Sequence, residues 1–308
     1  MTLHRIRLVG PSARGIRISA DILKDLLIFL VQGAQEAVRL RLEGRSRAPG
    51  KPSAWIERAA AFDFVGLEAG STQLLLEARS LRECAPEVFG QSQFFSEVDP
   101  SRTSLELLSE SLNDAVEGRE DSDLFDDGLI STFEELESVT AHGIERVEMD
   151  GQRPLSFDRK ALHRLGKLRR AIPPDQGVIV AGKLDLLKHR DRIFTLDLED
   201  GTSLRGVISS PEFNLRDLGK LWGTQVRISG TAKFRPSGRV LRVETESVVP
   251  APGDISLWSK SPRPIFAPLD ERALHVPQGP KSGVSAIFGQ WPGDENEEEF
   301  LEALRKIS

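Results

Sequence analysis

The sequence contains a single cysteine, Cys84, no tyrosine, and only 6% aromatic residues. One cysteine can form neither an intrachain disulfide nor a zinc site of several thiolates, so we expect a reducing, cytoplasmic environment. Long apolar runs are absent as well. The run Leu26–Val31 is far shorter than the roughly 20 residues that span a bilayer. Because the sequence also opens without a signal-peptide pattern, we expect neither membrane insertion nor secretion.

The residue patterns of common catalytic sites are missing too. The five histidines never stand four residues apart, and no nucleotide-binding glycine loop is present. Four aspartates gather between residues 121 and 127. They lack the glycine-centred loop and terminal glutamate of a calcium-binding hand, so we interpret them as a solvated acidic linker. The sequence therefore predicts a protein that is not an enzyme, with no catalytic residue, metal or cofactor.

Charge is divided unevenly along the chain, whose net charge is −6 over 308 residues. Residues 83–150 hold nineteen acidic and three basic residues, whereas residues 153–172 hold one acidic and seven basic residues. Four cations of the basic segment recur at helical spacing: Lys160, Arg164, Lys167 and Arg170. We expect this basic helix to dock on the acidic region 83–150. If the two are apart, each is a separate docking surface.

Residues 1–172 read as one α+β domain. Alternating residues predict strands at 4–9 and 144–149 and a pair of strands within 58–81. Apolar residues at helical spacing predict helices from Ser19 to Gly44, over 101–118 and near 129–139. A further helix over 157–171 is expected to be capped by Ser156.

Residues 173–250 predict a small β-barrel. Three strands, one helix at 213–222 and two more strands follow within about 75 residues, with glycines where strands would bend. This order resembles the OB-fold over residues 175–250, and a small SH3-like barrel is the alternative. The resemblance implies a ligand face flanked by two loops, which here carry five cations: Lys188, Arg190, Arg192, Arg235 and Arg239.

Such cations suit the phosphate backbone of a nucleic acid. The barrel nevertheless holds twelve basic and ten acidic residues, and only Phe234 is placed to stack on a base. Nucleic-acid binding by these five residues is therefore the alternative hypothesis for function.

The C-terminal part is a proline-rich arm at 251–286, with seven prolines between residues 250 and 280, followed by an interaction helix at 287–308. Asp294 and Glu297 have capping-box spacing. The string WPGDE…EEF…AL resembles the C-terminal tails of some bacterial antitoxins, which fold on a cognate toxin. The resemblance implies a protein partner such as a cognate toxin, bound by seven residues: Phe288, Trp291, Asp294, Glu295, Phe300, Leu304 and Ile307. The sequence thus favours a non-catalytic interaction protein.

Overall fold

Five antiparallel strands form one sheet in the N-terminal part of the chain. The computed structural model describes residues 1–68, 72–89, 98–151, 153–188, 193–209, 215–251 and 253–265. The sheet has the order β2-β3-β1-β4-β5. Its strands are β1 Thr2–Val9, β2 Phe62–Glu68, β3 Gln73–Ala78, β4 Arg146–Met149 and β5 Leu155–Asp158. His4, Ile6 and Leu8 of β1 are buried while their neighbours are exposed, because successive residues of a strand point to opposite faces.

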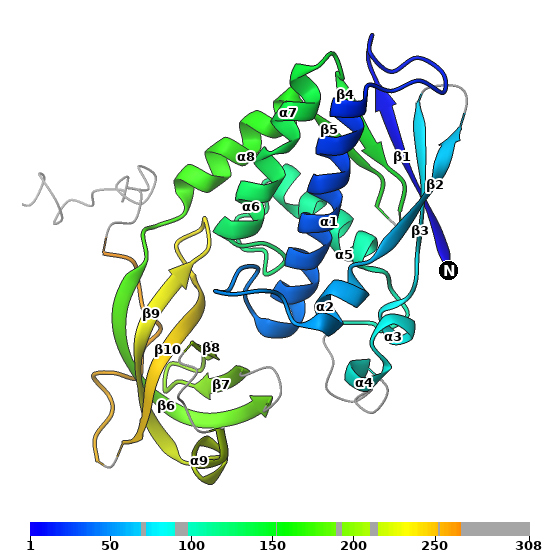
Figure 1. Cartoon of the computed structure of the whole chain (residues 1–308). Helices are drawn as coiled ribbons and strands as arrows, with labels where there is room; N and C mark the ends of the chain where they lie inside the picture. Colours follow the sequence, from blue (N-terminus) through cyan, green and yellow to red (C-terminus); the bar gives the residue numbers. More distant parts are fainter. Residues whose placement is uncertain are drawn as a thin grey trace, which may run out of the picture. The chain divides into compact units, whose positions relative to one another are not determined.

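Helices share one apolar core with the buried face of this sheet (Figure 1). They are α1 Ala20–Glu43, α2 Ala54–Ala59, α3 Leu81–Cys84, α4 Pro86–Phe89, α5 Ser104–Val116, α6 Asp127–Glu134, α7 Leu136–Ala141 and α8 Arg159–Ala171. The predicted ends of α1 are confirmed. Gly44 follows its last residue with a φ of 70°, which glycine adopts without a steric penalty. Ser19 precedes its first residue, although its hydroxyl makes no capping hydrogen bond.

The secondary structure differs from the sequence prediction at several places. Helix α2 includes the first two residues of the segment 58–81, which we expected to form a pair of strands, and the helix expected near 129–139 is two short helices. Helix α8 is capped by Asp158, whose carboxylate accepts from Ala161 N at 2.8 Å, and not by Ser156. The reason is that Leu155 and Phe157 are buried at alternate positions of β5, which pairs with β4.

Residues 176–250 form a closed barrel of five strands. The strands are β6 Gln176–Lys188, β7 Ile193–Asp197, β8 Ser203–Ile208, β9 Gln225–Phe234 and β10 Val240–Pro250. Their order is β10-β8-β7-β6-β9; β8 and β10 pair in parallel, and the other pairs are antiparallel. Helix α9, Leu215–Lys220, lies between β8 and β9 in the chain. The predicted α+β fold, with a five-stranded barrel after the N-terminal domain, is confirmed.

The barrel interior is filled by apolar side chains around the fully buried Phe194. Gly206 of β8 faces this ring, and a Cβ at that position would lie 2.2 Å from the nearest ring atom. No side chain fits at this distance, so this strand requires glycine here.

Residues 253–265 begin the proline-rich arm and lie along the barrel. Ala181 of β6 donates its N–H to the carbonyl of Trp258 at 2.9 Å, and Ser261 N donates to Asp200 at 3.1 Å. Ile255 is buried. This part of the arm is therefore held by the chain's own barrel. Residues 266–308, which include the rest of the arm and the predicted interaction helix, lie outside the described residues.

Two apolar cores are separate, one built from residues between 6 and 172 and the other from residues between 178 and 248. The N-terminal part and the barrel also contact each other, in part through ion pairs. In the part of the chain that the structure describes, no helix has the length and apolar character needed to cross a membrane.

Candidate functional site

The five cations predicted to bind nucleic acid divide between two connections of the barrel. Arg235 and Arg239 begin and end the loop that joins β9 to β10. Lys188 is the last residue of β6, and Arg190 and Arg192 lie outside the described residues.

The strand register separates these two connections. Ile193, which follows the β6–β7 connection, pairs with Val207 near the C-terminal end of β8. Val243 pairs in parallel with Gly206, so the loop 235–239 that precedes β10 lies at the N-terminal end of β8. Ile193 and the loop 235–239 therefore lie at opposite ends of β7 and β8.

Four arginines line one pocket at the N-terminal end of β8, which we call the arginine pocket: Arg205, Arg235, Arg239 and Arg263. Its volume is about 710 Å³, and its other walls come from β7, the β7–β8 hairpin and residues 261–264. The sequence prediction missed Arg205 and Arg263. Arg205 could have been found from the alternation in β8, because Leu204 and Ile208 point into the barrel core. Arg263 stands in the proline-rich arm, where no pattern marks it.

Acidic residues of the N-terminal part pair with two of these arginines. Arg235 forms an ion pair with Asp123, donates to the carbonyl of Val240 at 2.8 Å, and is only 15% exposed. Arg239 lies 3.6 Å from Asp121 in a pair that is open to solvent. Asp121 also accepts from the hydroxyl of Ser237. The chain's own carboxylates thus lower the positive charge of the arginine pocket.

Asp200 is a second acidic group in the pocket. Hydrogen bonds from Thr202, and one from the N–H of Ser261, hold the pKa of Asp200 below its ordinary value. This carboxylate is therefore charged at neutral pH and fixes the start of the arm to the β7–β8 hairpin.

Among the residues that the structure describes, no aromatic side chain lines the arginine pocket. Phe234, the one residue expected to stack on a base, is only 4% exposed and belongs to the barrel core. Trp222 is well exposed, but its indole donates to the carbonyl of Asp185, away from the pocket. Ligand binding in this pocket would depend on charge and hydroxyl groups alone.

The outer face of β7 and β8 is covered over part of its length. Ile193 and Val207 point away from the barrel core and are nevertheless buried. A Cβ on Gly44, just after α1, would contact the side chains of both residues. The end of α1 therefore packs on the outer face of β7 and β8.

Beside this contact, Arg242 of β10 forms an ion pair with Asp126 at 3.0 Å, and each side chain is only 7% exposed. Asp126 also accepts from the N–H and hydroxyl of Ser46 and caps α6 by accepting from Leu129 N at 3.1 Å. Burial alone would raise the pKa of Asp126, but Arg242 and these hydrogen bonds hold it below its ordinary value. The prediction of a solvated linker is therefore wrong for Asp126, and Asp121 and Asp123 pair with the barrel.

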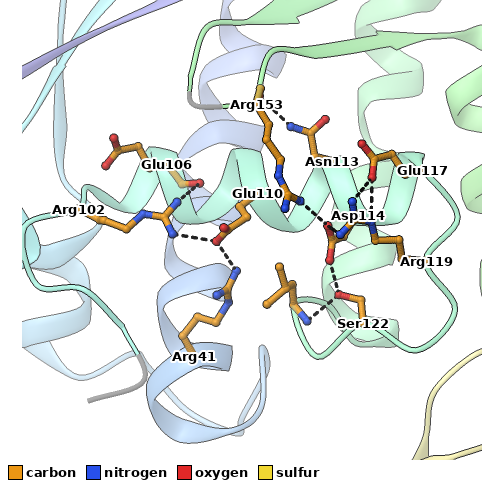
Figure 2. Close-up of polar contacts among 11 residues, drawn as sticks. Arg41, Arg102, Glu106, Glu110, Asn113, Asp114, Glu117, Arg119, Ser122 and Arg153 are labelled. Atoms are coloured by element: carbon orange, nitrogen blue, oxygen red, sulfur yellow. Dashed lines mark hydrogen bonds and ion pairs between the residues drawn. The ribbon is translucent and has the colours of Figure 1, made fainter. Parts of the chain in front are cut away.

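The acidic region 83–150 is also neutralised from within the N-terminal part, as Figure 2 shows for two carboxylates one turn apart on α5. Glu110 accepts from Arg41 at 3.1 Å and from Arg102 at 2.9 Å. Burial opposes ionisation of Glu110, but these arginines hold its pKa below the ordinary value.

The second carboxylate, Asp114, accepts from Ser122 at 2.7 Å and from Arg153 at 3.3 Å, and it pairs with Arg119 (Figure 2). These contacts join α5 to the segments on either side of it. Glu110 and Asp114 of α5 therefore hold the fold together and do not form an open acidic surface.

Groups with shifted pKa values outside these ion pairs show no sign of activation. Burial raises the pKa of the Cys84 thiol, whereas a nucleophilic cysteine requires a lowered one. Burial lowers the pKa of His4, whose Nε2 lies 3.1 Å from the hydroxyl of Thr103. Among the described residues, no three histidine, cysteine or carboxylate side chains are grouped to hold a metal ion.

The seven residues predicted to bind a protein partner, from Phe288 to Ile307, all lie outside the described residues. Comparison of the chain with protein-family models, with curated proteins and with solved structures found no match.

Proposed function

We propose that this chain is a non-catalytic interaction protein whose residues 287–308 bind a protein partner in the cytoplasm, as the tails of antitoxins do. Support comes from the C-terminal sequence. Phe300, Leu304 and Ile307 recur at helical spacing after a capping box. A helix this short is marginally stable alone in water, so it requires a surface to fold on. Trp291 supplies the kind of aromatic side chain that often dominates interface energies.

The barrel adds a second line of support. The strand order, the parallel pairing of β8 with β10 and the helix before β9 favour an OB-fold. In OB-folds the face of the second and third strands binds ligands. Here those strands are β7 and β8, whose outer face is partly covered by Gly44 and its neighbours. This covering favours a scaffold role for the barrel over an open ligand face.

The test uses the full chain as bait in its native host, beside a chain ended at Gly283. Bound proteins are identified by mass spectrometry, and the strongest candidate is purified and titrated. We expect truncation, or replacement of Phe300, Leu304 and Ile307 by Ser, to abolish binding. Replacement of Glu298 and Glu302 by Gln, which leaves the apolar stripe intact, is the matched control. A truncated chain that binds the purified partner as tightly as the full chain contradicts the proposal.

The arginine pocket supports a second candidate function, the binding of single-stranded nucleic acid by its phosphates. Four arginines around about 710 Å³ offer several donors to phosphate oxygens. Because none of the described residues that line the pocket is aromatic, and because Asp121 and Asp123 pair with Arg239 and Arg235, we expect weak binding without sequence preference.

A labelled single-stranded oligonucleotide titrated into the full chain tests this candidate. Affinity should fall with salt by about 0.7 log units per log unit of salt for each phosphate contacted. Replacement of Arg239 and Arg263 by Glu should reduce the affinity and this slope, whereas Lys51→Glu with Arg82→Glu should change the affinity little. Absence of binding at about 50 mM salt, or equal loss in both variants, excludes the pocket as a nucleic-acid site.

A further inference from the structure

Helix α8 has one apolar face and one strongly basic face. Ala161, Leu165 and Leu168 are buried and pack against the N-terminal core. The exposed side carries six residues, which we call the basic face of α8: Arg159, Lys160, His163, Arg164, Lys167 and Arg170. At about 100° per residue, these six fall within an arc of roughly 140° on the helix surface.

The basic face is not neutralised by the acidic region that the helix packs on. Helix α8 contacts α5, α6 and α7, as the sequence led us to expect, and Figure 1 shows it beside α6 and α7. The predicted docking on the acidic region is therefore confirmed, but its polar contacts are made by Arg164 and by Arg169, which lies outside the basic face and pairs with Asp127 and Glu134. Within the described residues, Lys160, Lys167 and Arg170 form no ion pair with that region.

No ion pair is formed by Arg159, Lys160, Lys167 or Arg170 within the described part of the chain. Arg164 donates to the backbone carbonyl of Val116 at 2.8 Å, which leaves its charge uncompensated. Five formal positive charges therefore remain together on one helix of a protein whose net charge is −6.

A pocket adjoins the first turn of α8. Its volume is about 970 Å³, and it is lined by four residues of the basic face together with Pro11, Thr140 and Gly143. Two acidic residues also line it: Glu145, and Asp158, which caps the helix. The loop that contains Pro11 carries two exposed arginines, Arg14 and Arg17.

We propose that the basic face of α8 binds the phosphodiester backbone of a double-stranded nucleic acid, a site separate from the tail and from the arginine pocket. The face runs about 16 Å along the helix, and a DNA duplex presents one negative charge per roughly 1.7 Å of its axis. Lysine, arginine and helical N–H groups are common phosphate donors.

The composition of the face favours a duplex over two other anionic partners. Protein interfaces are anchored by aromatic or aliphatic side chains, and the six exposed residues include neither. Single strands are bound by stacking bases on aromatic rings, which this face also lacks. A duplex presents phosphates at regular spacing and needs no such contact.

The experiment measures binding of a short labelled DNA duplex to the full chain over a range of salt concentrations. We expect the affinity to fall linearly with the logarithm of salt, with a slope of about 0.9 for each phosphate contacted. Replacement of Lys160, Lys167 and Arg170 by Glu should weaken binding by at least about tenfold at 50 mM salt and reduce the slope.

Three exposed cations on other segments provide the matched control, because Lys51→Glu, Arg82→Glu and Lys260→Glu make the same change in net charge. This control, and the Arg239 and Arg263 variant of the arginine pocket, should bind the duplex nearly as the unaltered chain does. The melting temperature of each variant is measured, and replacement of the same three residues of α8 by Gln serves if the Glu variant unfolds.

Three results overturn the proposal. The first is absence of duplex binding at about 50 mM salt. The second is equal weakening by the α8 variant and its control, which means that net charge alone is responsible. The third is equal competition by polyglutamate of matched charge, which indicates an acidic protein surface as the partner. Duplex binding by the basic face of α8 is independent of the proposed function, so a failure of the tail or of the arginine pocket to bind would not change it.

Discussion

Arg242 and Asp126 stand 116 positions apart in the chain and meet in an ion pair at 3.0 Å from which solvent is almost excluded. Removing one partner of a buried pair leaves the other charge without compensation, which typically costs about 3–5 kcal/mol. We therefore expect Arg242→Met to lower the free energy of unfolding by this amount, measured by urea denaturation.

The exposed pair of Arg239 with Asp121 is the control for this prediction. Such pairs contribute about 0–1 kcal/mol, so Arg239→Met should have little effect. The double variant Asp126→Asn with Arg242→Met should recover part of the loss. Equal effects of Arg242→Met and Arg239→Met would show that burial of the first pair has no energetic consequence.

The lowered pKa of Asp126 makes the stability of the fold depend on pH in the acidic range. Because the folded pKa lies below the unfolded value of about 3.9, Asp126 stabilises the fold fully above that value. The contribution is lost as the pH falls through the folded pKa. The stability difference between the unaltered chain and Asp126→Asn should therefore be constant above about pH 5 and shrink at lower pH. A difference that does not change with pH would contradict the assignment.

Glu36 should show the opposite sign. Its burial raises its pKa above the ordinary 4.5, against the effect of hydrogen bonds from Thr132 and Arg47. The folded state then keeps a proton that the unfolded state has lost, so stability falls as pH rises through the folded pKa. The melting temperature of the unaltered chain relative to Glu36→Gln should decline as the pH rises above the ordinary value of 4.5. Relative to Glu110→Gln it should instead rise with pH below that value and stay constant above it. Parallel curves for both variants would refute the prediction.

Gly206 tests the packing of the barrel. A methyl group there would overlap the ring of Phe194, and overpacking of a core typically costs about 1–3 kcal/mol. Gly206→Ala should therefore destabilise the protein. The double variant Gly206→Ala with Phe194→Leu should lose less free energy of unfolding than the sum of the losses in the two single variants. Gly177→Ala, where a Cβ meets nothing within 4 Å, is the control in denaturation experiments.

The succession of strands and helix along the barrel sequence and the ends of α1 could be predicted, because each depends on neighbours in the sequence. Alternation and turn residues mark the strands, and a glycine marks the end of α1. The cap of α8 could not be placed in this way, because Phe157 fits the start of a helix or the end of a strand. Phe157 belongs to the strand because it pairs with Val147 of β4.

The polar contacts of the candidate site could not be predicted from the sequence, for a different reason. Asp121, Asp123 and Asp126 stand in a polar, acidic segment that reads as solvated linker, and their partners come from loops and strands of a later domain. The exposed face of α8 was predicted correctly in its spacing. The sequence could not show that this face has no acidic partner among the described residues, because Glu110 and Asp114 of α5 pair with arginines of other segments.

The Asp126 carboxylate also has a consequence for the order of folding. It joins the residues after α1, the first turn of α6 and strand β10, across sequence separations of 80 and 116 residues. Closing such long loops costs conformational entropy before any contact repays it, and contacts of high sequence separation form slowly. We therefore expect the first turn of α6 to gain its full protection from hydrogen exchange only after the barrel has formed, so that synthesis of the last barrel strand completes a helix near the middle of the chain.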